Sequence, residues 1–271
     1  MAFDVTIGQY VEGRSLLHRL DPRTKIICIL LFMISLFVVK TAPGFALVIG
    51  AALVVLRLSQ VPVRYYFKAI KPLFLIIAFT ALMQMFLTPG HYLWQWRFLH
   101  ISEQGLYMAF IMCTRLVLLV LITSVLTLTT TPMMLTEAIE ALLKPFRRIG
   151  VPAHELAMMM TIALRFIPTL LEETDKIMKA QTARGADFES GGLLRRAKAL
   201  LPILVPLFLS ALQRAYDLAL AMEARCYHGG EGRTRLRELS YTRLDRVAFA
   251  IGVIFLLAAL VSRVGAYYAA L

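Results

Sequence analysis

Acidic residues are scarce in this sequence, which has 17 Asp and Glu against 29 Lys and Arg and a formal net charge of +12. A strongly basic chain can bind nucleic acid, but here the basic residues lie beside apolar stretches, and no aromatic-rich or glycine-rich RNA-binding motif accompanies them. We therefore expect no nucleic-acid partner. Asp and Glu are almost absent from the apolar stretches, which argues against a membrane-embedded enzyme acting on lipid, because such an enzyme needs acid and base groups at one membrane depth.

Cysteine is also rare, and the usual catalytic motifs are missing. Cys28, Cys113 and Cys226 are widely separated and indicate neither a disulfide framework nor a zinc site. The chain has no Gly-x-x-x-x-Gly-Lys-Ser/Thr phosphate loop and no Gly-x-Ser-x-Gly elbow, and His154-Glu155 lacks the second histidine of a zinc-protease helix. We also expect no cleaved signal peptide, because residues 1–25 have no apolar core that ends in a small-residue cleavage site. The sequence predicts no catalytic residue, metal or cofactor in this chain.

Apolar residues dominate instead: they make up 59% of the chain, against 17% charged residues, which suits a protein dissolved in lipid. Five apolar stretches predict membrane-spanning helices: Ile26 to Val39, Gly44 to Leu56, Leu73 to Leu87, Gly105 to Leu128 and Val247 to Val261. A helix needs about 20 residues to cross roughly 30 Å of hydrocarbon, so the first two must borrow flanking residues or thin the bilayer. We predict an all-α, polytopic helical membrane protein.

The orientation in the membrane follows from the basic residues of the short loops. The loop after the second stretch holds four basic residues and no acidic one: Arg57, Arg64, Lys68 and Lys71. The loop from Thr88 to Gln104 holds only Arg97 against Glu103. Because basic residues stay preferentially on the cytoplasmic side, we expect the first of these loops and the N-terminus to be cytoplasmic. With five spans, the C-terminus then lies outside.

A long segment between the fourth and fifth stretches, residues 132–245, holds more than half of the basic residues together with three helical patterns. The first helix starts at Pro132 with Thr131 as its cap, and the next two run from about His154 to Arg184 and from about Leu193 to Cys226. We expect these helices to be cytoplasmic. The predicted organisation is therefore 1–131 for the first four spans, 132–245 for the cytoplasmic helices, and 246–271 for a last span that packs on the first four.

An alanine-arginine pair recurs at the end of each of the two long helices, in Ala183-Arg184-Gly185 and in Ala224-Arg225-Cys226. One interpretation is that each arginine only complements the negative end of its helix dipole and bonds the last carbonyls. The other is that both bind a partner. Helices joined by a short connection run antiparallel or cross, so the two arginines lie far apart and suit a two-lobed partner, whose carboxylates a guanidinium can bind in a fork.

Two further arginines lie within apolar stretches, where a charge is expensive and can mark a functional site. For Arg115, in the fourth stretch, a structural role through helix carbonyls or snorkelling is favoured over a role in transport. Arg165 admits the same two interpretations, and carbonyls freed by Pro168 lie within its reach.

Two regions of the sequence resemble a known family. Leu17-His18-Arg19-Leu20-Asp21-Pro22-Arg23-Thr24-Lys25 is similar to an N-terminal signature, and the two arginine triplets match paired coupling-helix motifs. The chain thereby resembles the T component, the scaffold membrane subunit, of energy-coupling factor (ECF) transporters, a branch of the ATP-binding cassette importers. The order of elements is similar over nearly the whole chain. Cys226 departs from the glycine that is usual in the second motif.

The resemblance implies a non-catalytic coupling subunit in the cell membrane of a prokaryote. Two cytoplasmic ATPase subunits would bind ATP and Mg²⁺ and contact Ala183, Arg184, Gly185, Ala224, Arg225 and Cys226. A substrate-binding membrane protein, the S component, would dock on the same helices and release a vitamin or metal ion inside. Methionines around these helices either adapt to several S components or simply fill space: Met133, Met134, Met158, Met159, Met160, Met178 and Met222.

Two other functions compete with this one. A self-sufficient secondary transporter should have repeated bundles with broken helices, which five unequal spans do not offer. The membrane-embedded lipid enzyme is the other alternative. On the scaffold interpretation the transported solute is chosen by another polypeptide, so this sequence does not name it.

Overall fold

The computed structural model describes residues 10–39, 41–89, 92–96, 99–188, 192–229 and 239–269. The chain divides into two compact units. The bundle unit consists of Gly8–Leu135 with Leu239–Leu271, and the hairpin unit consists of Thr136–Glu238 with Met1–Ile7. The bundle unit is therefore built from two separate parts of the sequence, and the hairpin unit contains most of the segment that lies between them.

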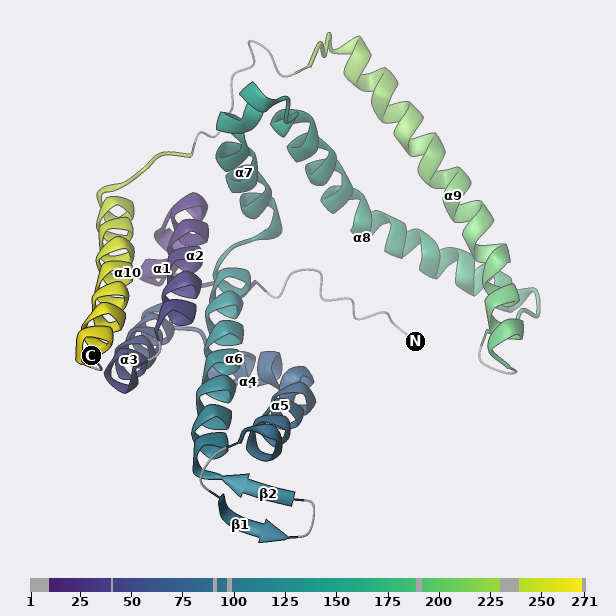
Figure 1. Ribbon diagram of the computed structural model, residues 1–271. Helices are drawn as coiled ribbons and strands as arrows, with labels where there is room; N and C mark the ends of the chain where they lie inside the picture. The colour runs from purple at the N-terminus through teal and green to yellow at the C-terminus, as the bar shows by residue number, and fades with distance from the viewer. Residues whose placement is uncertain are drawn as a thin grey trace. The chain divides into compact units, whose positions relative to one another are not determined.

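The bundle unit contains a helix for each of the five predicted apolar stretches (Figure 1). Its helices are α1 (Leu16–Arg19), α2 (Pro22–Val38), α3 (Ala42–Ser59), α4 (Val63–Ile70), α5 (Phe74–Leu87), α6 (Glu103–Thr129) and α10 (Arg243–Ala269). Hydroxyl caps fix two of the helix starts. The Thr41 Oγ1 accepts a hydrogen bond from the Gly44 N–H at 3.3 Å, and the Ser102 Oγ accepts one from the Gly105 N–H at 2.9 Å.

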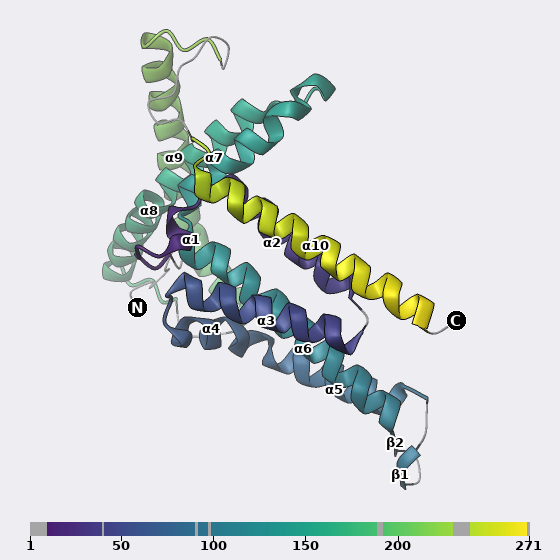
Figure 2. The ribbon, with the colours of Figure 1, turned by 90° about the vertical axis from the view of Figure 1, so that its left-hand side faces the viewer.

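Aliphatic and aromatic side chains from four helices form the core of this unit, with Leu36, Val48, Ile122 and Ala259 almost completely buried. The last helix, α10, lies along α2, and the two long axes run side by side in both ribbon views (Figure 2). The rings of Phe32 and Phe255 stack between them, with their centroids 5.5 Å apart. α10 therefore completes a bundle whose other helices come much earlier in the chain.

Two loops of the predicted topology contain regular structure instead. The basic loop after the second stretch includes the short helix α4, which continues through a 3₁₀ turn at Lys71–Leu73 into α5. The loop between α5 and α6 forms an antiparallel hairpin of β1 (Tyr92–Trp96) and β2 (Leu99–Ser102), with Tyr92 opposite Ser102. The all-α prediction thus holds for the membrane helices, and this hairpin is an addition to it.

The hairpin unit is named for two long helices, α8 (Ala153–Ala183) and α9 (Leu193–Ala224). Before them α7 (Pro132–Leu143) starts in the bundle unit, with the predicted Thr131 cap accepting from the Met134 N–H at 3.3 Å. A 3₁₀ turn at Lys144–Ile149 follows and ends at Gly150, whose φ is +89°. The α8 and α9 helices run antiparallel, and Arg214 on α9 makes an ion pair of 2.9 Å with Glu173 on α8.

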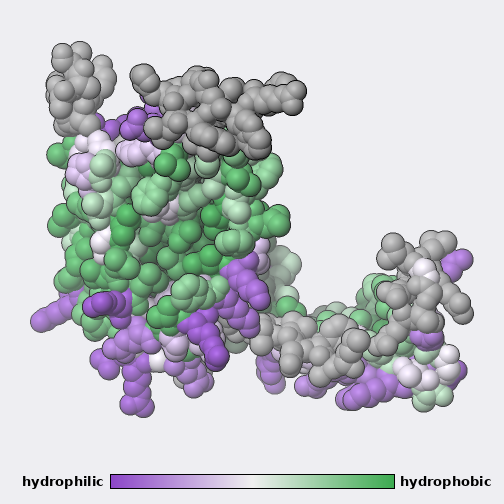
Figure 3. All heavy atoms as spheres, turned by 90° about the horizontal axis from the view of Figure 1, so that it is seen from below, coloured by the Kyte–Doolittle hydropathy of each residue, from purple (hydrophilic) through white to green (hydrophobic). Residues whose placement is uncertain are grey.

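Six helical segments of the described chain are long and apolar enough to cross a membrane. They are 42–59, 63–87, 103–129, 153–183, 198–224 and 243–263. Figure 3 shows a broad hydrophobic surface on the bundle unit, bordered along one edge by hydrophilic side chains. The chain is thus a multi-pass helical membrane protein, as predicted. Two of the six segments belong to α8 and α9, and α2 is shorter, at 17 residues, so the cytoplasmic position of residues 132–245 stays a prediction.

Candidate functional site

The two predicted arginine tips have the same backbone geometry. At the end of α8, the Gly185 N–H donates to the Thr182 carbonyl at 2.9 Å, and the Ala186 N–H donates to the Gln181 carbonyl at 3.0 Å. Arg184 is the C-cap, with φ −87° and ψ 5°. This pair of bonds, with a left-handed residue after the C-cap, is the Schellman motif.

The end of α9 repeats this arrangement residue for residue. The Cys226 N–H donates to the Glu223 carbonyl at 2.8 Å, the Tyr227 N–H donates to the Met222 carbonyl at 3.1 Å, and Arg225 is the C-cap. Gly185 has a φ of +87°, and Cys226 adopts the same left-handed region with a φ of +56°. The departure from glycine therefore leaves the cap geometry unchanged, although a non-glycine residue there costs about 1–3 kcal/mol of backbone strain.

Both arginine tips are exposed at the surface. All six residues of the two triplets are exposed. Within the described residues, neither guanidinium makes a hydrogen bond or an ion pair, so the expected bonds from the arginines to the last helix carbonyls are not observed. With respect to the described residues, each guanidinium therefore has its five N–H donors available for a partner.

The antiparallel pairing places the two tips at opposite ends of the hairpin unit. Tyr227, just after the second tip, has its hydroxyl 3.5 Å from the His154 Nε2 at the start of α8. The first tip ends α8, whose 31 residues span roughly 46 Å at about 1.5 Å per residue. Arg184 and Arg225 are thus two copies of one local structure, separated by nearly a helix length.

Between the tips, α9 carries an exposed apolar stripe. Its members recur at intervals of three and four residues: Leu201, Leu204, Val205, Phe208, Leu209, Leu212 and Tyr216. Four of the seven methionines singled out from the sequence are also exposed: Met133, Met134, Met159 and Met160. An uncovered apolar surface of this size fits contact with lipid or with another membrane protein.

The arginines inside the apolar stretches have different surroundings. The Arg115 Nη2 donates to the carbonyl of Val39 at 3.3 Å, at the end of α2, and its guanidinium lies 5.5 Å and 5.6 Å from the ring centroids of Phe37 and Phe45. These contacts fit the structural interpretation. Arg165 is exposed and makes no hydrogen bond to any described residue, so the suggested contact with carbonyls freed by Pro168 is not found.

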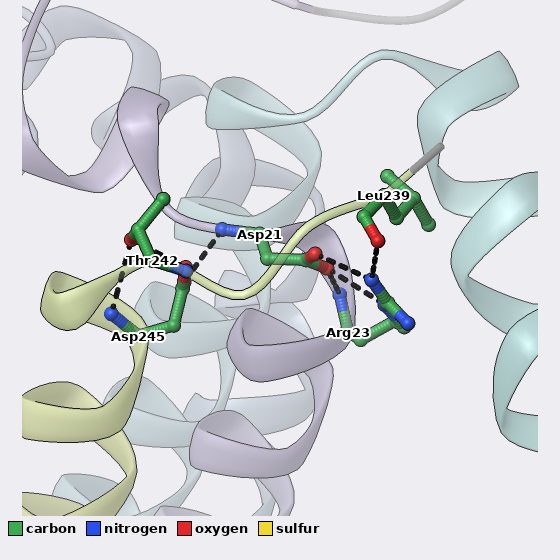
Figure 4. A network of polar contacts seen from close by, with 5 residues as sticks. All are labelled: Asp21, Arg23, Leu239, Thr242 and Asp245. Atoms are coloured by element: carbon green, nitrogen blue, oxygen red, sulfur yellow. Dashed lines mark hydrogen bonds and ion pairs between the residues drawn. The ribbon is translucent and has the colours of Figure 1, made fainter. Parts of the chain in front are cut away.

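The N-terminal signature has a structural role that its sequence alone did not reveal (Figure 4). Asp21 caps α2, and its carboxylate accepts from the Arg23 Nε at 3.1 Å and the Arg23 Nη2 at 2.9 Å. The same Nη2 donates to the Leu239 carbonyl at 2.6 Å, just before α10. The signature therefore holds the segment that leads into the last helix.

Asp245 makes the second half of this junction. Its Oδ2 accepts from the Thr242 N–H at 2.8 Å and the Thr242 hydroxyl at 2.6 Å, which caps α10. Its Oδ1 accepts from the Asp21 N–H at 2.7 Å. One carboxylate, only 1% exposed, thus caps α10 and binds the residue that caps α2. The spacing Thr-x-x-Asp before an apolar stretch is the sequence signal that could have identified the cap.

Two other signature residues, Lys25 and His18, make further contacts within the bundle unit. The Lys25 Nζ donates to the Thr129 carbonyl at 2.9 Å and to the Thr130 Oγ1 at 3.1 Å, at the end of α6. Lys25 precedes the apolar stretch that starts at Ile26, and its side chain is buried. The His18 Nε2 lies 2.9 Å from the carbonyl of Val11. Among the described residues, no group of three or more His, Cys, Asp or Glu could hold a metal ion.

Known proteins resemble this chain over nearly all of its length. A family model described as cobalt transport protein, CbiQ, matches residues 13–236. Curated relatives named energy-coupling factor transporter transmembrane protein EcfT include that of Acidaminococcus fermentans, 54% identical over 90% of this chain and 91% of the relative. Those of Clostridium kluyveri and Bacillus subtilis are 52% and 50% identical, over 97% and 90% of this chain and 98% and 93% of the relatives.

Proposed function

This chain belongs to the CbiQ family as an ECF transporter transmembrane component, and on that premise we propose that it couples ATP hydrolysis by two cytoplasmic ATPase subunits to solute uptake. In this proposal the ATPases bind ATP and Mg²⁺, a separate S component binds a vitamin or another micronutrient, and this chain is a non-catalytic scaffold. When ATP binds, the two ATPase subunits close on each other, which moves the hairpin unit and reorients the S component.

The observation that carries the proposal is the pair of identical arginine-tipped caps. Arg184 and Arg225 present free guanidinium groups from the same Schellman geometry at opposite ends of one helix pair. Two equivalent ATPases need two equivalent docking points, and the spacing of nearly a helix length suits two separate lobes. We assign one ATPase to Ala183, Arg184 and Gly185, and the other to the triplet around Arg225.

The exposed apolar stripe of α9 is the proposed docking surface for the S component. Its side chains, such as Leu204 and Phe208, need an apolar partner or lipid. Met159 and Met160 are exposed on α8, and their flexible thioethers suit a surface shared by several S components. Solute specificity then belongs to the S component.

The proposed location is the cell membrane of a prokaryote. Arg57, Arg64, Lys68 and Lys71 are all exposed near the end of α3 and along α4, and this basic end is assigned to the cytoplasm. The N-terminus and the hairpin unit are then cytoplasmic, with the C-terminus outside.

The test is co-purification of the chain with the two ATPase subunits. Arg184→Glu and Arg225→Glu should each weaken ATPase binding about 30-fold or more, because losing one partner of a desolvated interfacial ion pair costs about 2–5 kcal/mol. Arg184→Lys keeps the charge but not the planar fork and should have an intermediate effect. Arg148→Glu is the matched control, since Arg148 is exposed in the same unit but is not a C-cap.

Two results would contradict the proposal. One is a double variant at Arg184 and Arg225 that retains both ATPases and full substrate-stimulated ATP turnover. The other is transport or catalysis by the chain reconstituted alone in vesicles, which would favour a secondary transporter or a lipid enzyme.

A further inference from the structure

A groove in the bundle unit lies at the bend between α3 and α4. Its volume is about 620 Å³. Its walls come from α3, α4 and α6 and are mainly apolar, and one cation, Arg57, lines it at the last turn of α3. The apolar lining includes Leu53, Leu56, Phe67, Ile70 and Leu121. The groove therefore combines a long apolar surface with a single positive charge.

Hydrogen bonds fix the shape of this groove. The Ser59 hydroxyl donates to the Leu56 carbonyl at 2.6 Å and lies 2.8 Å from the hydroxyl oxygen of Tyr66, which lines the groove. The Val61 N–H donates to the Ser59 Oγ at 3.3 Å, and Gln60 between them is left-handed, with a φ of +55°. Ser59 and Tyr66 are buried, so the bend is a built feature of the fold and the groove exists before any ligand binds.

The helix α4 is amphipathic, and its apolar face is the groove wall. Val63, Tyr66, Phe67 and Ile70 follow the spacing of one helical face, and all four line the groove. The basic residues of the helix lie on other faces. A short helix of this kind, with a basic face and an apolar face, lies in the interface of a bilayer.

The charge around the groove is positive and uncompensated. The sequence has no acidic residue between Asp21 and Glu103. The nearby cations are exposed, and none of them makes an ion pair with a described residue: Arg57, Arg64, Lys68 and Lys71. Basic pockets between membrane helices bind anionic lipid headgroups, and each cation near the surface contributes about 1 kcal/mol.

We propose that this groove binds one anionic phospholipid, with the headgroup phosphate on Arg57 and an acyl chain along Leu53, Phe67 and Ile70. Charge complementarity selects an anionic headgroup, and the apolar walls select a lipid over a free phosphate ion. The bound lipid fills the bend between α3 and α4. This inference goes beyond the coupling role and does not depend on it, because every lining residue belongs to the bundle unit.

The test measures lipid retention by the full-length chain in detergent. Phosphatidylglycerol or phosphatidylcholine with the same acyl chains is titrated, and native mass spectrometry counts the bound molecules. We expect one tightly bound phosphatidylglycerol. Arg57→Gln should weaken its binding about fivefold and should weaken the binding of the zwitterionic phosphatidylcholine less. Arg246→Gln is the control for charge, since Arg246 is exposed at the start of α10 and does not line the groove.

A second pair of variants tests the acyl-chain contact. Phe67 and Phe74 are both 69% exposed, but only Phe67 is a lining residue. Phe67→Ala should weaken the binding of both lipids, and Phe74→Ala should weaken the binding of neither. The proposal is overturned if the two lipids bind equally, or if Arg57→Gln and Arg246→Gln lose the same amount of phosphatidylglycerol binding. It is overturned as well if Phe67→Ala and Phe74→Ala change lipid binding equally. It is also overturned if a photo-crosslinker at position 67 captures a polypeptide in native membranes and not a phospholipid.

Discussion

The junction at Asp245 gives the sharpest stability prediction. In the native protein the Asp245 Oδ2 accepts a hydrogen bond from the Thr242 N–H at 2.8 Å. Asp245→Asn keeps an oxygen for the Asp21 N–H but places an amide NH₂, which cannot accept, against the Thr242 N–H. The variant thus leaves the part-buried Thr242 N–H without its acceptor, at about 1–3 kcal/mol, and weakens a charge-assisted bond. We expect the free energy of unfolding to fall by roughly 3 kcal/mol in total, which lowers the melting temperature by about 6–12 °C.

The first assay is a thermal melt of the purified chain in detergent, followed by circular dichroism. Asp217→Asn is the matched control, because Asp217 is exposed and accepts a single bond from the Gln213 Nε2 at 3.0 Å. Its effect should stay within about 0.5 kcal/mol. If Asp245→Asn melted within about 2 °C of Asp217→Asn, the assigned role of the junction would be wrong.

A crosslink separates helix docking from general stability. A Cβ at Gly252 on α10 would lie 3.6 Å from the Cys28 Sγ on α2, so Gly252→Cys should form a disulfide with Cys28 under mild oxidation. The background carries Cys113→Ala and Cys226→Gly. Adding Asp245→Asn should slow the crosslink, because α10 then leaves α2 more often. An unchanged rate would show that packing alone holds the two helices together.

Two further changes test contacts described above. Cys226→Gly should relieve the strain of the left-handed backbone and stabilise the end of α9 by about 1 kcal/mol, while Cys226→Val should destabilise that helix end. Hydrogen exchange of the Tyr227 amide measures both effects, and equal exchange rates in the two variants would contradict the cap assignment. Lys25→Met should destabilise the bundle unit by about 1–3 kcal/mol, because the Thr129 carbonyl loses its hydrogen-bond donor. The control is Lys176→Met at an exposed site, and a melting temperature of Lys25→Met no lower than that of this control would contradict the prediction.

The helices could be predicted because their signals are local. Apolar stretches located the five long helices of the bundle unit, and Thr131-Pro132 marked the start of α7. The ends of α8 and α9 were also predictable, since each has an arginine followed by the residue that turns left-handed. Such signals act within a few residues and need no knowledge of the rest of the fold.

Several of the contacts missed from the sequence join distant residues. Asp21 and Asp245 are 224 positions apart, and Arg115 and the Val39 carbonyl are 76 apart. Nothing along the chain indicates which buried acceptor meets which donor until the helices pack. The helix α4 was missed for a different reason: it has only eight residues, two of them cations, which is too few for periodicity to stand out. The Ser59–Tyr66 bond that fixes the bend is visible only in three dimensions.

The division of the bundle unit has a consequence for biosynthesis. The α10 helix supplies Phe255 and Ala259 to the packing against α2, and Asp245 to the start of that helix. These residues leave the ribosome only after the whole of the hairpin unit has been translated. Until then, the face of α2 that packs against α10 has no partner. A nascent chain that stalls before residue 239 therefore exposes this face to quality-control factors or neighbouring polypeptides.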